Sequence, residues 1–296
     1  ALHLAASDFV STLISLQHDS NTQIEKVKAG RQWENIDIWA EVNDDHLIII
    51  EDKTSTGHHS NQLSRYRETA LNWCEERNAQ LTCIYLKTHS ESLASLKSVE
   101  KENYAIFTRS DFLSILNKHD VANEIYQDFK EHLQGIEDSE AEYKKKKPEN
   151  WIAGQWIGLY QSLELSGVIE SWGYVPNQTG GFWNAILGGT EHEKMPIYLQ
   201  IEQGQLCIKI GEVYDNRAPI RNRLHHFLVN NAIDENPIQK PSRFGSGTYM
   251  TVASSPRETW LITDNEGIID LEATSQKLSS YKKWLCQVIN TKLEKI

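Results

Sequence analysis

The chain has 296 residues, of which 39% are hydrophobic and 24% are charged, as in typical globular proteins. Its longest aliphatic run, Leu47 to Ile50, is far shorter than the roughly 20 residues that cross a bilayer, so we expect no membrane partner. The four cysteines form no zinc-type pair and no secretory signal opens the chain, so we expect a cytoplasmic location.

The formal net charge is −11, and the acidic excess lies in the first part of the chain. Residues 1–140 hold 13 of the 30 Lys and Arg residues but 24 of the 41 Asp and Glu residues. Proteins that bind nucleic acid usually carry a basic surface. The charge distribution therefore argues against tight, processive binding of DNA.

The first part of the chain predicts alternating helices and strands. Apolar residues recur at helical spacing in residues 5–16, and short runs rich in Ile, Val, Leu and Tyr indicate strands. Ser60 is the predicted N-cap of the second helix, and Ser110 or Asp111 that of the third. The predicted helices span residues 5–16, 60–77, 110–116 and 121–133, and the predicted strands span residues 24–28, 36–42, 46–52, 81–87 and 104–107.

A polar stretch separates this region from the rest of the chain. Residues 135–150 contain several acidic residues, then Lys144 to Lys147 and Pro148, and are predicted to be a charged linker. The lysines could touch phosphate, but a linker or a solvated helix end is favoured. Two domains are thus predicted, residues 1–134 and residues 151–296.

The second predicted domain contains six of the nine tryptophans, and its pattern of helices and strands starts anew. We expect it to be an α+β accessory domain, smaller than the first. Its predicted helices span residues 152–167, 217–232 and 271–293, and its predicted strands span residues 182–187, 197–202, 206–211 and 249–253.

Two predicted strands of the first domain flank Asn43 to Asp45 and indicate a hairpin. Pairing Val42 with His46 leaves a three-residue loop and places Asp37 opposite Glu51, on one face of the sheet. A two-residue turn would place Glu51 on the other face, because a slip of one residue reverses every side chain. We predict the three-residue loop.

Polar side chains gather around this hairpin. Glu51, Asp52 and Lys53 end its second strand, and Glu51 and Lys53 share one face because side chains alternate along a strand. In the following predicted helix, Gln62 and Tyr66 are four residues apart and therefore lie on one helical face.

The residues Asp37, Glu51, Lys53, Gln62 and Tyr66 resemble, in that order, the motif of the PD-(D/E)XK nuclease superfamily. The Gln-x-x-x-Tyr helix is similar to the branch that contains lambda-type exonucleases and the nuclease domains of bacterial recombination helicases. The resemblance covers roughly the first 120 residues. It implies an α/β, restriction-endonuclease-like fold with a mixed sheet flanked by helices.

The resemblance also implies a role for each residue. Asp37, Glu51 and the backbone carbonyl of Asp52 would bind Mg²⁺, for which Mn²⁺ can substitute. Lys53 would orient or deprotonate the attacking water or offset negative charge, and Gln62 and Tyr66 would hold that water or the scissile phosphate. The alternatives are a surface hairpin with solvated charges and, for Tyr66, a place in the core.

Many members of the superfamily have a further metal ligand in the first helix. Only His3 and Asp8 lie near the expected place in this sequence, which puts an arrangement of two metal ions in doubt. His58 and His59 precede the Gln62 helix and could approach the site, although an exposed loop is favoured.

Three arginines are candidates for contact with nucleic acid phosphate. Arg31 lies just before the hairpin, where a surface position is equally expected. Arg217 and Arg221 recur at helical spacing in the second domain and could form a cationic face. A solvated outer helix face is at least as well supported by the sequence.

The sequence therefore favours a metal-dependent nuclease, a Mg²⁺-dependent phosphodiesterase acting on DNA. RNA stays open as a substrate, and so does the choice between endonuclease and exonuclease action. A role in bacterial defence or DNA processing fits the resemblance. The alternative is a catalytically inactive module on a nuclease fold that binds nucleic acid or assembles, and a homodimer is left open.

Overall fold

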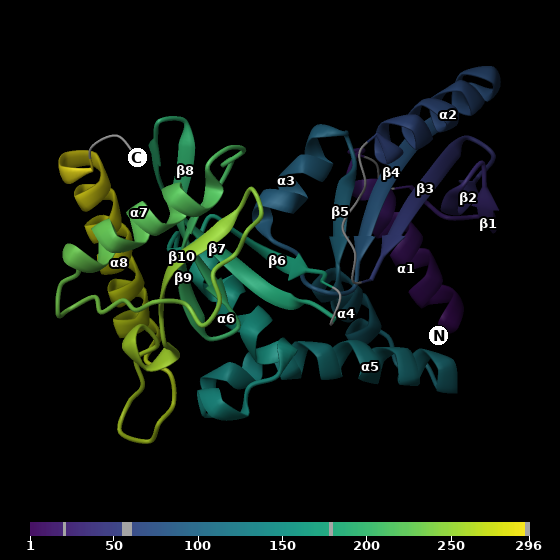
Figure 1. Ribbon diagram of the computed structural model, residues 1–296. Coiled ribbons are helices and arrows are strands. Elements are labelled where there is room, and N and C mark those ends of the chain that lie inside the picture. The colour runs from purple at the N-terminus through teal and green to yellow at the C-terminus, as the bar shows by residue number, and fades with distance from the viewer. Residues whose placement is uncertain (20–21, 55–60, 178–179, 294–296) are drawn as a thin grey trace. The chain divides into compact units, whose positions relative to one another are not determined.

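The computed structural model describes residues 1–19, 22–54, 61–177 and 180–293, and Figure 1 shows its helices and strands. The chain divides into two compact units, Ala1–Asp138 and Ser139–Ile296, each with its own five-stranded sheet. The second unit is the longer of the two, although a smaller one was expected. The predicted domain limits near residues 134 and 151 stay a prediction.

The first unit contains a mixed sheet in the order β1-β2-β3-β4-β5. Strands β1, β2 and β3 are antiparallel neighbours, whereas β3, β4 and β5 run parallel. Its elements are α1 (Leu2–Ser15), β1 (Val27–Trp33), β2 (Ile36–Val42), β3 (His46–Lys53), α2 (Gln62–Arg77), β4 (Gln80–Lys87), α3 (Leu93–Lys101), β5 (Ala105–Thr108), α4 (Arg109–Lys118) and α5 (Glu124–Ala141), whose last turn reaches into the second unit.

Helices cover both faces of this sheet. Leu47 and Ile49 of β3 pack in one buried cluster with residues of α2 and α3, and Ile48 and Ile50 pack in another with residues of α1 and α4. A strand that is buried on both faces needs apolar residues at successive positions, which explains the aliphatic run in β3. The expected mixed sheet flanked by helices is confirmed.

The β2–β3 hairpin has the predicted three-residue loop, since Val42 pairs with His46. Asn43 has a φ of 52°, in the left-handed region that Asn tolerates well. Its side chain accepts hydrogen bonds from the backbone N–H groups of Glu25 and Lys26, at 2.9 and 3.1 Å. The loop is thereby tied to the segment that leads into β1, which stabilises the register.

Several predicted boundaries in the first unit are wrong. The N-cap of α4 is Thr108, whose hydroxyl accepts from the backbone N–H of Asp111, while the carboxylate of Asp111 accepts from that of Thr108. The N-cap of α2 is Asn61; Ser60 lies outside the described residues. Helix α3 was not predicted, β1 begins later than expected, and α5 includes residues 135–141 of the expected linker.

The second unit is built on an antiparallel sheet in the order β10-β9-β8-β7-β6. The expected α+β class is confirmed, and β6 is the strand that the sequence pattern did not reveal. Its elements are α6 (Ala153–Leu165), β6 (Ser171–Val175), β7 (Phe182–His192), β8 (Met195–Glu202), β9 (Gln205–Ile210), α7 (Arg217–Asn230), β10 (Met250–Ser255), α8 (Leu271–Lys292) and the 3₁₀ turns η1 (Glu142–Lys144), η2 (Pro148–Asn150) and η3 (Arg257–Thr259).

The tryptophans of the second unit build its core. Five of them are buried in one cluster, and Trp183 packs against it. Buried indole N–H groups need acceptors: that of Trp260 donates to the carbonyl of Gly204 at 3.2 Å, and that of Trp172 donates to Glu164 at 2.7 Å. The aromatic content of this unit is therefore explained by packing.

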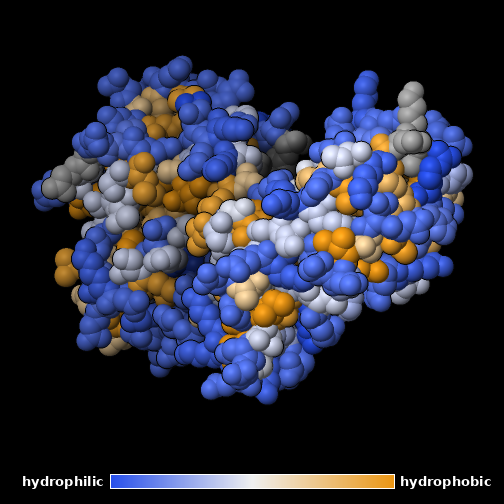
Figure 2. Space-filling model, turned by 90° about the vertical axis from the view of Figure 1, so that its left-hand side faces the viewer, coloured by the Kyte–Doolittle hydropathy of each residue, from blue (hydrophilic) through white to orange (hydrophobic). Residues whose placement is uncertain are grey.

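The surface is mostly hydrophilic, as the charged and polar composition predicts. On the face drawn in Figure 2, hydrophilic residues dominate, and hydrophobic residues gather in small groups between them. Of the helices in the described parts of the chain, none is long and apolar enough to span a membrane.

The buried His46 generates a prediction about stability. Its ring lies 4.9 Å from that of His18, and burial lowers its pKa, with His18 adding to the effect and Asp45 opposing it. The unfolded chain therefore binds a proton more readily than the folded one, so stability is lost as pH falls below about 6.5, the ordinary value for His. We expect His46→Phe to reduce the difference between the urea midpoints at pH 8 and pH 5.

The matched control is His132→Phe, because His132 is an exposed residue of α5 in the same unit. An unchanged pH dependence in His46→Phe would show that other groups cause the loss of stability.

Candidate active site

The end of the β2–β3 hairpin brings two carboxylates together. Strand β2 pairs with β3 through Ile38 and Ile50, and one further step of this register places Asp37 opposite Glu51. The backbone N–H of Asp52 donates to Asp37 Oδ2 at 3.1 Å. Asp37 and Glu51 therefore lie on the sheet face that packs against α2, as the three-residue loop predicts.

Glu51 is the most buried acidic residue of this group, with 1% of its surface exposed. Its Oε1 lies 2.5 Å from Lys53 Nζ and accepts a hydrogen bond from Gln62 Nε2 at 2.8 Å. Its Oε2 is buried and has no hydrogen-bond partner among the described residues. Burial raises the pKa of Glu51, as does the charge of Asp37, while Lys53 acts in the opposite direction.

Helix α2 supplies the amide and phenol groups of the site. Gln62, in its first turn, donates to Glu51 and to the hydroxyl oxygen of Tyr66, the latter at 3.2 Å. Tyr66 is 5% exposed and packs with Leu63 and Ala70 in the core. The place of Tyr66 in the core is thus confirmed, and its hydroxyl reaches Gln62, while its role at the water or the phosphate stays a prediction.

The chemistry of these residues fits a divalent cation. Mg²⁺ prefers oxygen ligands, takes one or two protein carboxylates and keeps several waters. Glu51 Oε2 and the Asp37 carboxylate offer oxygens of this kind, and the backbone carbonyl of Asp52 as a third ligand stays a prediction. Nowhere in the described residues do three or more His, Cys, Asp or Glu side chains form a metal-binding group. The predicted ligand set has two carboxylates and one backbone carbonyl, so it does not need a group of three such side chains.

The first helix gives no support for a second metal ion. Asp8 lies 2.9 Å from both Lys118 Nζ and His119 Nε2, at the contact between α1 and α4. These hydrogen bonds lower the pKa of Asp8. His3 is exposed, and α1 packs on the sheet face opposite to Glu51. His58 and His59 lie outside the described residues.

The predicted phosphate-binding arginines lie in different settings. Arg31 is exposed on β1. Arg217 donates to the carbonyl of Val213 at 3.2 Å, and Arg221 donates to that of Gly245 at 2.7 Å and stacks on Phe244. These contacts give Arg217 and Arg221 a local structural role, and contact with nucleic acid stays a prediction.

One ionic group beside the site was not predicted. Lys87 ends β4 as Lys53 ends β3, and the two lysines are register partners in the parallel pair. Lys87 is 4% exposed and lies 3.3 Å from Glu91. Because the carboxyl ends of parallel strands meet at one sheet edge, the lysine that ends each strand was the signal that could have revealed this group.

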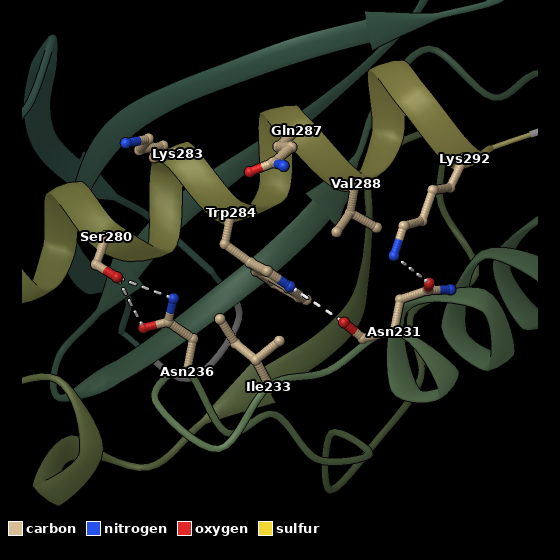
Figure 3. A pocket seen from close by; sticks show the side chains of 9 residues that line it. All are labelled: Asn231, Ile233, Asn236, Ser280, Lys283, Trp284, Gln287, Val288 and Lys292. Atoms are coloured by element: carbon tan, nitrogen blue, oxygen red, sulfur yellow. Dashed lines mark hydrogen bonds between the residues drawn. The ribbon is translucent and has the colours of Figure 1, made fainter.

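The second unit has a pocket of about 290 Å³ between α8 and the segment that follows α7 (Figure 3). Trp284 and Lys292 point toward Asn231, and Ser280 faces Asn236. The Trp284 indole donates to the Asn231 carbonyl at 3.1 Å, and Asn236 donates to Ser280 at 3.1 Å. The lining residues that the structure describes include no carboxylate, so they lack the groups that the hairpin site combines.

Comparison with known proteins gives a match to a family in the first part of the chain. No curated protein and no solved structure matches the chain. Residues 3–148, which span nearly all of the first unit and the start of the second, match the model of the PD-(D/E)XK nuclease superfamily.

Proposed function

We propose that this protein is a metal-dependent nuclease whose active site lies at the end of the β2–β3 hairpin. The observation that carries the proposal is the buried carboxylate of Glu51, with Lys53 and Gln62 on Oε1 and no described partner for Oε2. Asp37 lies near enough to raise the pKa of Glu51 further. The match of residues 3–148 supports the same chemistry.

Under this proposal, separate residues bind the metal, position the water and support the metal ligands. Asp37, Glu51 and the Asp52 carbonyl bind Mg²⁺, with Mn²⁺ as a substitute. When bound, the cation neutralises phosphate charge and makes an attacking water more acidic. Lys53 orients that water or takes its proton. Gln62 holds Glu51 in place and is itself steadied by Tyr66.

DNA is the favoured substrate, because the Gln62 and Tyr66 helix resembles the branch that contains lambda-type exonucleases. RNA, the choice of endo or exo cleavage, a homodimer, a cytoplasmic location and a role in bacterial defence or DNA processing remain open parts of the proposal. Arg31, Arg217 and Arg221 are its candidate phosphate contacts.

The competing function is a catalytically inactive module that binds nucleic acid or assembles. The acidic excess of residues 1–140 favours the assembly form of this alternative, because like charge repels phosphate. The intact set of Asp37, Glu51 and Lys53 favours catalysis. Incubation with linear, circular and single-stranded DNA and with RNA, in Mg²⁺, Mn²⁺ or EDTA, separates the two functions.

We expect Asp37→Asn, Glu51→Gln and Lys53→Met each to reduce cleavage by about 10²–10³-fold or more, because each removes a charge that acts on the metal, water or phosphate. Gln62→Leu should cost about 10–100-fold, since Gln62 acts through Glu51. The measurement is the initial rate of cleavage in Mg²⁺.

The control for these variants is Asp44→Asn, which changes an exposed carboxylate of the hairpin loop that pairs with Lys26. Its rate should equal that of the wild type. Wild-type rates in all three charge variants would place the active site elsewhere.

The raised pKa of Glu51 predicts a conflict between stability and function. The charged form is disfavoured in the folded state, so the stability that its protonation supplies is lost as pH rises through the folded pKa. We therefore expect Glu51→Gln to melt at a higher temperature than the wild type at pH 7 in EDTA. Mn²⁺ at one hundred times its Kd should stabilise the wild type by about 2.7 kcal/mol and the variant much less.

Glu41→Gln is the control for the melting experiment, because Glu41 is a half-buried carboxylate of β2 on the same face as Asp37. It should keep the full response to Mn²⁺. Equal responses in the wild type and Glu51→Gln would mean that the ion binds elsewhere.

A further inference from the structure

Two lysines at the edge of the site, the half-buried Lys53 and the buried Lys87, bring like charges together. Lys53 and Lys87 are register partners, and neighbouring strands are only about 4.8 Å apart. Their side chains share one face, and like charges placed directly across from each other repel. Lys87 is 4% exposed, so its charge needs a partner inside the protein.

Glu91 is a described carboxylate partner of Lys87. Its Oε2 lies 3.3 Å from Lys87 Nζ and accepts a hydrogen bond from the Tyr85 hydroxyl at 2.9 Å. Its Oε1 accepts from the Ser95 hydroxyl. Glu91 is 9% exposed and lies in the loop between β4 and α3. Donors on both oxygens therefore hold this carboxylate in one orientation.

The loop that carries Glu91 is held by Arg109, the first residue of α4 after β5. Arg109 donates to the carbonyl of Thr88 at 3.0 Å and to the hydroxyl of Ser90 at 3.2 Å, and it pairs with Glu137 at 2.9 Å. Arg109 is 5% exposed. The position of Glu91 thus depends on a second buried cation.

Glu51 is an acidic residue that the register places on the same sheet face as Lys87. Tyr85 is the register partner of Glu51, and Lys87 follows two residues later on the same face. Glu51 Oε2 is buried and has no described hydrogen-bond partner, so it can receive a lysine as well as a metal ion. A lysine on Oε2 would compete with the ion for the same oxygen.

We propose that Glu91 is a positioning residue of the metal site: it binds Lys87 and thereby keeps Glu51 Oε2 free for a divalent cation. This inference rests on the proposed function, because it assigns that oxygen to the metal. Glu91 does not touch the ion or the substrate.

The test is isothermal titration of the full chain with Mn²⁺ alone. We expect Glu91→Gln to bind Mn²⁺ about 10–100-fold more weakly than the wild type, the range typical for residues that orient metal ligands. The double variant Glu91→Gln/Lys87→Met removes the competing lysine and should regain most of the affinity. Glu41→Gln also takes a carboxylate from a lysine in this unit, Lys28, away from the Glu91 loop, and it should bind as the wild type does.

Two results would overturn the inference. One is wild-type affinity in Glu91→Gln, and the other is a double variant as weak as the single one. If Glu91→Gln does not fold, Glu91→Asp replaces it: the shorter side chain reaches Lys87 less well, so weaker binding is expected and unchanged binding contradicts the inference.

A parallel titration of Glu51→Gln separates this inference from the proposed function. Loss of Mn²⁺ binding in Glu51→Gln together with full binding in Glu91→Gln would reject the role of Glu91 alone. Full binding in Glu51→Gln, or no binding in the wild type, would reject both.

Discussion

The arrangement of the first unit depends on a carboxylate that is buried at the end of a sheet. Glu51 follows three consecutive isoleucines of β3, which helices cover on both faces, so its side chain cannot reach bulk water. Burying a charge is unfavourable unless it is paired. Lys53 and Gln62 compensate one oxygen of Glu51 and leave the other with no described partner. The buried oxygen Glu51 Oε2 thus has an unfavourable environment, and a bound cation would compensate its charge.

The rest of the unit holds that group in place. The hairpin register puts Asp37 beside Glu51, and the side chain of Asn43 secures the loop on which the register depends. Helix α2 packs its Tyr66 ring into the core and so carries Gln62 to Glu51. The core residues and the site residues alternate along the same strand, so the packing that stabilises the sheet also aims the carboxylates.

Local patterns predicted the features that depend on local geometry. Strand alternation and loop length were enough to place Asp37 with Glu51, and helical spacing was enough to place Gln62 with Tyr66. The pairing of Lys87 with Glu91 was missed because Glu91 lies in the loop after β4, where no regular pattern places side chains, and because the lysines that end β3 and β4 were not read together as a signal. The capping box of Thr108 and Asp111 was missed because Asp, Ser and Thr compete as N-caps over four adjacent positions. Helix α5 was cut short because a polar, charged sequence suits both a linker and a solvated helix.

The charges around the site bear on how it would bind phosphate under the proposed function. The two lysines at the strand ends are each neutralised by a glutamate, so the described site offers phosphate little net positive charge of its own. The acidic excess of residues 1–140 adds repulsion. Under the proposed function, the cation therefore contributes to substrate binding as well as to chemistry, since it supplies the positive charge that the protein lacks. An acidic composition and a nuclease site are then compatible, because binding that depends on the metal does not need the basic surface of proteins that hold DNA without one.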